Sequence, residues 1–170
     1  KTSLLRLMAG LNRPTNGVIC WEGAVITDNP EAHYERFCFV GHADAIKATL
    51  SVRENLTFWA ALRGTTNRVG SALEYFGLGH LADIPAKFLS AGQRRRLALS
   101  RLLTTKAPLW LLDEPGAALD QEANHSLREA IAQHRAHGGM LVLATHGEEI
   151  PPKGEILKLV FTTCIKEPAL

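Results

Sequence analysis

The pair Asp113 and Glu114 directly follows an apolar run at residues 109–112, an arrangement that can do chemistry. The run predicts a buried strand, and open α/β sheets place their ligands at the carboxyl ends of their strands. An aspartate at that position can hold Mg²⁺ through oxygen, directly or through water, and the adjacent glutamate can orient or deprotonate a nucleophilic water. The alternative interpretation is a strand that ends in a solvated acidic turn, because Asp-Glu-Pro also forms ordinary turns.

A second group of residues lies upstream of that strand, at the predicted start of a helix. It comprises Ser90, Ala91, Gly92 and Gln93. Ser90 can cap the helix, and the small Ala91 and Gly92 let backbone N–H groups approach an anion where the helix dipole also favours phosphate. The alternative interpretation is an ordinary helix cap followed by a solvated basic helix face. That face would comprise Arg94, Arg95, Arg96 and Arg101.

The chain opens with Lys1 and Thr2 at the start of an apolar helix. In the phosphate-binding loop G-x-x-x-x-G-K-[ST], the lysine reaches the β- and γ-phosphate oxygens and the hydroxyl ligates Mg²⁺. Only the last two positions of that pattern occur here, and the same dipeptide can open a helix without such a role. His146 follows an apolar run at 140–144, where it can hydrogen-bond a γ-phosphate or act as an ordinary loop residue.

The spacing of apolar residues predicts the elements that must position these side chains. Expected helices cover residues 1–11, 51–64, 68–76, 92–103 and 121–136, and expected strands cover 18–21, 25–26, 37–40, 109–112, 140–144 and 156–161. Alternating strands and helices imply βαβ units and a mostly parallel sheet, so the predicted fold class is α/β. Residues 51–90 form a predicted helical insert between two of the strands.

Composition narrows the class of protein. The 170 residues are 46% hydrophobic and 21% charged, and no apolar stretch approaches the roughly 20 residues that a bilayer span needs. The formal net charge of +2 is too small to indicate a nucleic-acid-binding surface. Cys20, Cys38 and Cys164 occur in no C-x-x-C arrangement, which argues against a disulfide scaffold or a zinc ribbon and favours a reducing cytoplasm.

The order of these motifs makes the sequence similar to the nucleotide-binding domain of ABC transporters over essentially its whole length, residues 1–170. The resemblance implies a P-loop NTPase fold with an inserted helical subdomain, and ATP and Mg²⁺ as cofactors. It implies that Lys1 and Thr2 end the Walker A loop. Thr2 and Asp113 would hold the magnesium ion, and Glu114 would be the general base. The remaining assignments are Ser90, Ala91, Gly92 and Gln93 to the ABC signature, with Ala91 in place of its first glycine, Asp120 to the D-loop, and His146 to the switch histidine.

Position 42 narrows the choice within the family. The resemblance places His42 where the family carries the Q-loop glutamine, and imidazole can replace an amide as a polar contact to water or a metal. The sequence resembles ATP-binding subunits of the bacterial cytochrome c maturation transporter, the haem exporter. The features that carry this resemblance are the pair Gly41 and His42, the form Leu-Ser-Ala-Gly-Gln-Arg-Arg-Arg at 89–96 and the short insert. His42 therefore joins Glu114 and His146 as an expected catalytic residue.

The resemblance also implies partners and a location. Two such domains pair head to tail, so that each ATP lies between the Walker motifs of one copy and the signature of the other. Closure on ATP would be transmitted through the insert to a membrane-embedded permease that acts in c-type cytochrome biogenesis. The chain would be a peripheral protein on the cytoplasmic face of the bacterial inner membrane, without a nucleic-acid partner. Phe58 or Trp59 would contact the permease or belong to the core of the insert.

Two other functions stay open at the level of sequence. An ABC-type ATPase of another pathway, including nucleic-acid metabolism or translation, would share the motifs, although long coiled-coil, zinc-hook or tandem-domain additions do not occur in these 170 residues. The other is a catalytically inactive interaction protein, suggested by the position of Lys1. The family normally places two or three strands and an adenine-stacking aromatic residue before this lysine. We therefore expect an N-terminally incomplete domain that lacks those strands, with the activity assigned to the intact parent protein.

Overall fold

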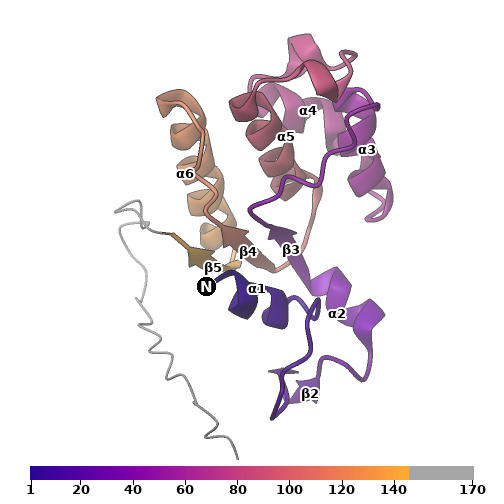
Figure 1. The fold of residues 1–170 in the computed structure, drawn as a ribbon, viewed down its shortest axis with the longest axis vertical. Coiled ribbons are helices and arrows are strands. Elements are labelled where there is room, and N and C mark those ends of the chain that lie inside the picture. The colour runs from indigo at the N-terminus through magenta and orange to yellow at the C-terminus, as the bar shows by residue number, and fades with distance from the viewer. Residues whose placement is uncertain (146–170) are drawn as a thin grey trace, which may run out of the picture.

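The central element of the structure is a parallel sheet of three strands. The computed structural model describes residues 1–145, and the predicted strand at 156–161 lies outside the described residues. The strands are β3 (Phe37–Val40), β4 (Leu109–Asp113) and β5 (Met140–Ala144), in the spatial order β3-β4-β5 (Figure 1). Every residue of β4 is buried, as expected for an apolar strand in the middle of a covered parallel sheet. The predicted α/β class with a parallel sheet is confirmed.

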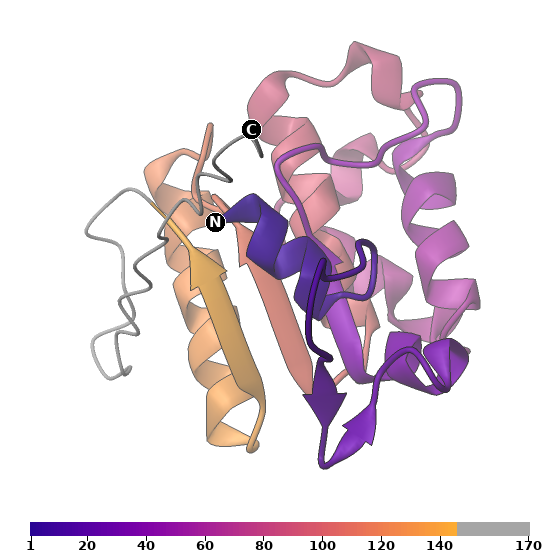
Figure 2. The same cartoon turned by 60° about the horizontal axis from the view of Figure 1, so that its bottom comes forward.

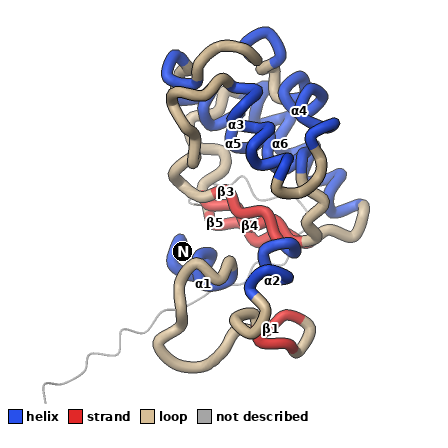
Figure 3. The backbone as a smooth tube through the Cα atoms, turned by 90° about the vertical axis from the view of Figure 1, so that its right-hand side faces the viewer, coloured by secondary structure: helices blue, strands red, loops and turns tan. Residues whose placement is uncertain are grey.

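Helices cover both faces of this sheet. α1 (Thr2–Met8) packs on β4 and β5, whereas α5 (Ala91–Thr104) and α6 (Gln121–Ala136) pack on the opposite face (Figures 2 and 3). Along β4, Leu111 belongs to the core cluster under α1 and Leu112 to the cluster under α5 and α6, because side chains alternate between the faces of a strand. Within residues 1–145, no helix is long and apolar enough to cross a membrane.

The segment before β3 differs most from the expectation. α1 ends at Met8 rather than near residue 11, because Gly10 takes a left-handed φ of 67° and turns the chain. α2 (Pro30–Arg36) is not predicted by apolar spacing. It begins after Asn29, whose side chain caps the helix, and the one residue it buries is His33. Its mostly polar sequence therefore carries no helical period of apolar residues.

A small antiparallel pair lies apart from the main sheet. β1 (Cys20–Trp21) and β2 (Ala24–Val25) are joined by the predicted turn at Glu22 and Gly23. Figure 3 shows this pair, together with α1 and α2, on the opposite side of the main sheet from α3 to α6. The predicted strand pair is confirmed, although both strands are short.

Helices fill the chain between β3 and β4. α3 (Val52–Ala61) begins with the predicted capping box. Ser51 Oγ accepts a hydrogen bond from the Glu54 N–H at 3.1 Å, and Glu54 Oε2 accepts one from the Ser51 N–H at 2.7 Å. α4 (Val69–Tyr75) follows within the expected range of 68–76. Short 3₁₀ turns complete the segment at Thr66–Arg68, Gly79–Leu81 and Ala86–Phe88.

α5 contributes to two hydrophobic cores. Leu97 belongs to the cluster formed with α3, α4 and the turns that follow them. Leu99 and Leu102 belong to the cluster between α5, α6 and the sheet, and Leu103 packs against both clusters. α5 thus joins the helical segment to the sheet. Nothing in the structure tests the predicted bounds of 51–90 for a helical subdomain, which stay a prediction.

The first turn of α5 lies very close to the segment that leads into α6. A Cβ atom added at Gly92 would lie 2.9 Å from the backbone oxygen of Ala118, a separation that real Cβ atoms essentially never show. Ala118 itself takes a left-handed φ of 62°. Position 92 therefore accepts glycine alone unless the backbone shifts.

We expect Gly92→Ala to lower the free energy of unfolding by about 1–3 kcal/mol, because the added methyl group displaces the Ala118 backbone. Gly70→Ala in α4 is the matched control, since its added methyl group meets no atom within 4 Å. This control should gain up to about 1 kcal/mol, the helix preference of alanine over glycine. Urea unfolding measures both values. A gain in both variants would show that the contact at Gly92 does not constrain the fold.

Candidate functional site

Asp113 and Thr2 meet at the carboxyl end of the sheet. Asp113 is the last residue of β4, and its exposed fraction is 2%. Thr2 begins α1, and its hydroxyl donates a hydrogen bond to Asp113 Oδ2 at 2.7 Å. A buried carboxylate needs such a donor, because removing it from water is otherwise costly. The fold thus brings together two residues that the sequence separates by 111 positions.

Lys1 lies at the same edge of the sheet. Its Nζ donates a hydrogen bond to the backbone oxygen of Thr145 at 2.6 Å, directly after β5. His146, the predicted switch histidine, is the next residue and lies outside the described residues. The charge of Lys1, the hydroxyl of Thr2 and the carboxylate of Asp113 therefore gather at the edge where parallel sheets bind ligands.

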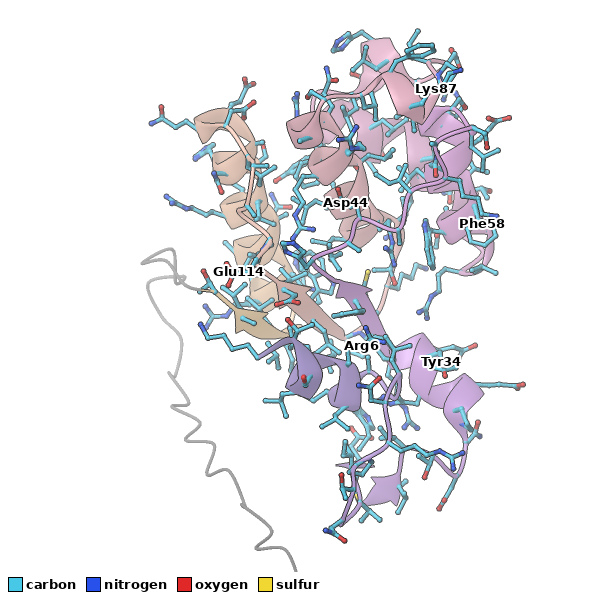
Figure 4. All side chains as sticks on the ribbon, viewed as in Figure 1. Arg6, Tyr34, Asp44, Phe58, Lys87 and Glu114 are labelled. Atoms are coloured by element: carbon cyan, nitrogen blue, oxygen red, sulfur yellow. The ribbon has the colours of Figure 1, made fainter. Side chains whose placement is uncertain are left out.

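Glu114 occupies a strained turn next to this group. Its φ of 47° is left-handed, a conformation that costs a residue other than glycine roughly 1–3 kcal/mol and that clusters at active sites. Its N–H donates to the backbone oxygen of Ala144 at 2.8 Å, which ties the turn to β5. Figure 4 shows Glu114 at the carboxyl end of the sheet. A half-buried carboxylate in this place can orient a water molecule or accept its proton.

Ser90 and Gln93 bond each other at the start of α5. Ser90 Oγ accepts from the Gln93 N–H at 3.2 Å, and Gln93 Oε1 accepts from the Ser90 N–H at 2.8 Å. This reciprocal pair is a capping box, with Ala91 and Gly92 between its two members. The first turn of α5 carries no acidic residue, so its positive dipole end is not neutralised there. Contact of these residues with a nucleotide stays a prediction.

The structure shows the surroundings of Asp120 and His42 but does not test the roles predicted for them. Asp120 Oδ1 accepts a hydrogen bond from the Ala123 N–H at 2.8 Å and so caps α6. His42 is exposed in the loop after β3, next to Gly41. The roles of Asp120 in a D-loop and of His42 in catalysis therefore stay predictions.

The prediction of a solvated basic face on α5 is wrong for Arg95. This residue is 4% exposed. Its guanidinium donates hydrogen bonds to the backbone oxygens of Gly41, Asp113, Glu114 and Pro115 and to Asp44 Oδ1. Arg95 is not among the site residues that the sequence predicts, because a run of three arginines is typical of a surface. The helical period is the signal that points to its burial, since Arg95 lies one turn before the buried Leu99.

The same prediction is wrong for Arg101. Its guanidinium lies over the ring of Trp59, 3.8 Å from the centroid, and it donates to the Phe39 backbone oxygen at 3.2 Å. Burial lowers the pKa of Arg101 below its ordinary value. Trp59 is half-buried, whereas 46% of Phe58 is exposed. Phe58 is therefore the more accessible of the two residues considered for contact with a permease.

The pair of Thr2 and Asp113 fits a magnesium ion that is shared with phosphates. Mg²⁺ prefers oxygen ligands and is usually bound through one or two carboxylates plus substrate phosphates, not by an all-protein cage. Within residues 1–145, no group of three or more His, Cys, Asp or Glu side chains could hold a metal ion. A hydroxyl beside a buried carboxylate is the arrangement by which P-loop NTPases hold Mg²⁺ with their nucleotide.

Comparisons with known proteins identify the family. A family model described as "ABC transporter" matches residues 1–117. The cytochrome c biogenesis ATP-binding export protein CcmA of Paramagnetospirillum magneticum is 49% identical over 164 residues, which cover 94% of this chain and 76% of that protein. The protein of the same name from Rhodospirillum rubrum is 50% identical over 160 residues, which cover 94% of this chain and 69% of that protein.

Two solved structures share the fold. One is described as the ATP-binding subunit of an ABC transporter. It has a TM-score of 0.77 and 26% identity, and the match covers 86% of this chain but 63% of that one. The other is described as a dimeric ATP-binding cassette in a post-hydrolysis state, bound to ADP and Pi. It has a TM-score of 0.76 and 21% identity, and the match covers 86% of this chain and 69% of that one. At this identity the likeness shows the fold alone. The chain therefore belongs to the ABC transporter family of ATPases, and within it to the cytochrome c biogenesis ATP-binding export proteins.

Proposed function

We propose that the protein containing this chain binds and hydrolyses ATP as a subunit of an ABC transporter, and that it energises a membrane permease in c-type cytochrome biogenesis of the haem-export type. The contact between Thr2 and Asp113, beside Glu114, is the observation that carries the ATPase part of this proposal. The names of the two relatives that are about half identical support the pathway.

Lys1, Thr2 and Asp113 would bind the nucleotide. The ammonium group of Lys1 would attract the β- and γ-phosphate oxygens, and the oxygens of Thr2 and Asp113 would hold Mg²⁺. A bound Mg²⁺ ion offsets negative charge on the phosphoryl oxygens. The hydrogen bond from Thr2 to Asp113 holds the two oxygen donors together before the ligand arrives.

Glu114 would act on the attacking water. Its carboxylate orients that water and accepts its proton as the bond to phosphorus forms. The backbone of Glu114 is held in a left-handed turn and is bonded to Ala144, which restricts the positions that the carboxylate can take. His42 and His146 would add polar contacts to the terminal phosphate or the water.

A second copy of the protein would complete the site. At the start of α5, the side-chain oxygens of Ser90 and Gln93 each accept a hydrogen bond from the backbone N–H of the other residue. These bonds are thus within this helix start and not with the Thr2 and Asp113 group. A head-to-tail dimer would bring this helix start, with its positive dipole end, to the phosphates bound by the other copy. Asp120 would then lie near the dimer contact, because its segment touches Gly92.

The permease would contact the helical segment between β3 and β4. Phe58 and Leu62, on and just after α3, expose 46% and 65% of their surface. Exposed apolar side chains of this kind are available for a protein partner. The subunit would then sit peripherally on the cytoplasmic face of the bacterial inner membrane, attached through its permease.

We expect Glu114→Gln to lower the ATP turnover of the intact transporter by a factor of about 10²–10⁴, the usual contribution of a general base. ATP binding should be retained, because glutamine preserves the size of the side chain. Phosphate release and the binding of a fluorescent ATP analogue measure the two quantities. Glu122→Gln, an exposed change in the first turn of α6, is the matched control. Normal turnover in Glu114→Gln would remove Glu114 from this mechanism.

Thr2→Val removes the hydroxyl that donates to Asp113 and nearly preserves the side-chain volume. Because the buried carboxylate loses this donor, we expect the free energy of unfolding to fall by about 1–3 kcal/mol. The Mg²⁺ concentration for half-maximal ATPase activity should rise by roughly tenfold or more. A magnesium titration of the intact transporter tests this, with the exposed Thr27→Val as control. An unchanged titration would contradict the assignment of Thr2 to the metal.

A further inference from the structure

Arg95 uses every N–H group of its guanidinium. An arginine side chain has five N–H donors and no acceptor, and Arg95 makes five hydrogen bonds while 4% exposed. Its neighbours in the run differ. Arg94 donates to the Leu89 backbone oxygen at 2.6 Å and Arg96 to the Phe76 backbone oxygen at 3.3 Å, and neither acceptor belongs to residues 113–115. Of these three arginines, Arg95 is the one bonded to the end of β4.

One side of the guanidinium holds the turn at Glu114. Nη2 donates to the backbone oxygens of Asp113 and Glu114, each at 2.8 Å, and Nε donates to that of Pro115 at 3.2 Å. Three consecutive carbonyl groups therefore converge on one rigid, planar group. The middle residue of the three has the left-handed φ described above, so Arg95 fixes the backbone from which the Glu114 carboxylate extends.

The other side of the guanidinium holds the loop after β3. Nη1 donates to the Gly41 backbone oxygen at 2.8 Å and to Asp44 Oδ1 at 3.0 Å. The carboxylate of Asp44, whose side chain is 24% exposed, balances the charge of the nearly buried guanidinium. His42 lies between these two acceptor residues in the sequence. Figure 4 shows Asp44 in the loop between β3 and α3, and Glu114 at the end of β4.

We propose that Arg95 is a positioning residue, which orients Glu114 for ATP hydrolysis and links it to the loop that carries His42. This inference rests on the proposed role of Glu114. Neither lysine nor glutamine can reproduce the contacts, because lysine has three donors on one nitrogen and the glutamine amide has two. A change at Arg95 thus releases the turn, the loop or both, while Lys1, Thr2 and Asp113 keep their side chains.

The test uses Arg95→Lys in the intact transporter. Because a misplacement of about 1 Å can cost a factor of about 10² in rate, we expect kcat to fall by roughly 10- to 100-fold. The dissociation constant for ATP should stay within about threefold, since nucleotide binding does not use Arg95. Arg96→Lys, the same substitution one position along α5, is the matched control and should retain the normal kcat.

A double-mutant comparison separates positioning from general stabilisation. If Arg95 acts through Glu114, Arg95→Lys lowers kcat in the normal protein but causes no further fall in the Glu114→Gln background. An equal fall in both backgrounds would overturn the proposal, and so would a normal kcat in Arg95→Lys. Collapse of turnover in Glu114→Gln together with a normal Arg95→Lys would refute this inference while leaving the proposed function intact. Normal turnover in Glu114→Gln would refute this inference together with the proposed role of Glu114.

Asp44→Ala is the second variant, for use if Arg95→Lys does not fold. It removes one acceptor of Nη1 and leaves the three carbonyl contacts at residues 113–115 in place. We expect a several-fold lower kcat at unchanged ATP affinity, again without a further fall in the Glu114→Gln background. A normal kcat in Asp44→Ala would overturn the link between the loop and Glu114.

Discussion

Asp113 carries a carboxylate into a place that water barely reaches, at the end of a strand buried along its whole length. A charge in such a place is tolerated only when hydrogen-bond donors lie close to it. Thr2 is one such donor, so α1 must begin at the carboxyl edge of β4. Lys1 comes to the same edge with it and bonds Thr145 beyond β5. The ammonium group of Lys1, the hydroxyl of Thr2 and the adjacent acids Asp113 and Glu114 therefore gather at one edge because the buried carboxylate of Asp113 needs a hydrogen-bond donor.

The conformation of Glu114 depends on a second buried charge. The Arg95 guanidinium takes up three successive carbonyl groups there, and Asp44 balances its charge. Because every N–H of this planar group has an acceptor, the segments that it joins cannot separate without leaving a buried donor unpaired. Arg95 therefore joins the loop at Gly41 to the turn after β4. The strand pairing of β3 with β4 ends at Val40 and Leu112, before this loop and this turn begin.

Periodicity predicts the elements that bury an apolar face and fails for those that polar contacts hold. The strand Phe37–Val40 and α6 occur where the pattern predicts them. The mostly polar α2 is not predicted by apolar spacing, although Asn29 before a proline is a helix-start signal. The contact of Thr2 with Asp113 cannot follow from spacing alone, and the resemblance to ABC domains led to it. The contacts of Arg95 cannot be predicted from the sequence for another reason. Its acceptors belong to residues 41–44 and 113–115, and only the fold brings these two segments together.

The position of α5 between two cores has a thermodynamic consequence. Leu97 packs into the helical segment while Leu99 and Leu102 pack under the sheet, all from the same helix. Unfolding of either core would expose the apolar side chains on one face of α5 to water. The helix would then be less stable, and the other core would lose the packing that α5 provides. The described chain should then lose its structure in a single cooperative step, with no stable state in which the helical segment is unfolded and the sheet is intact.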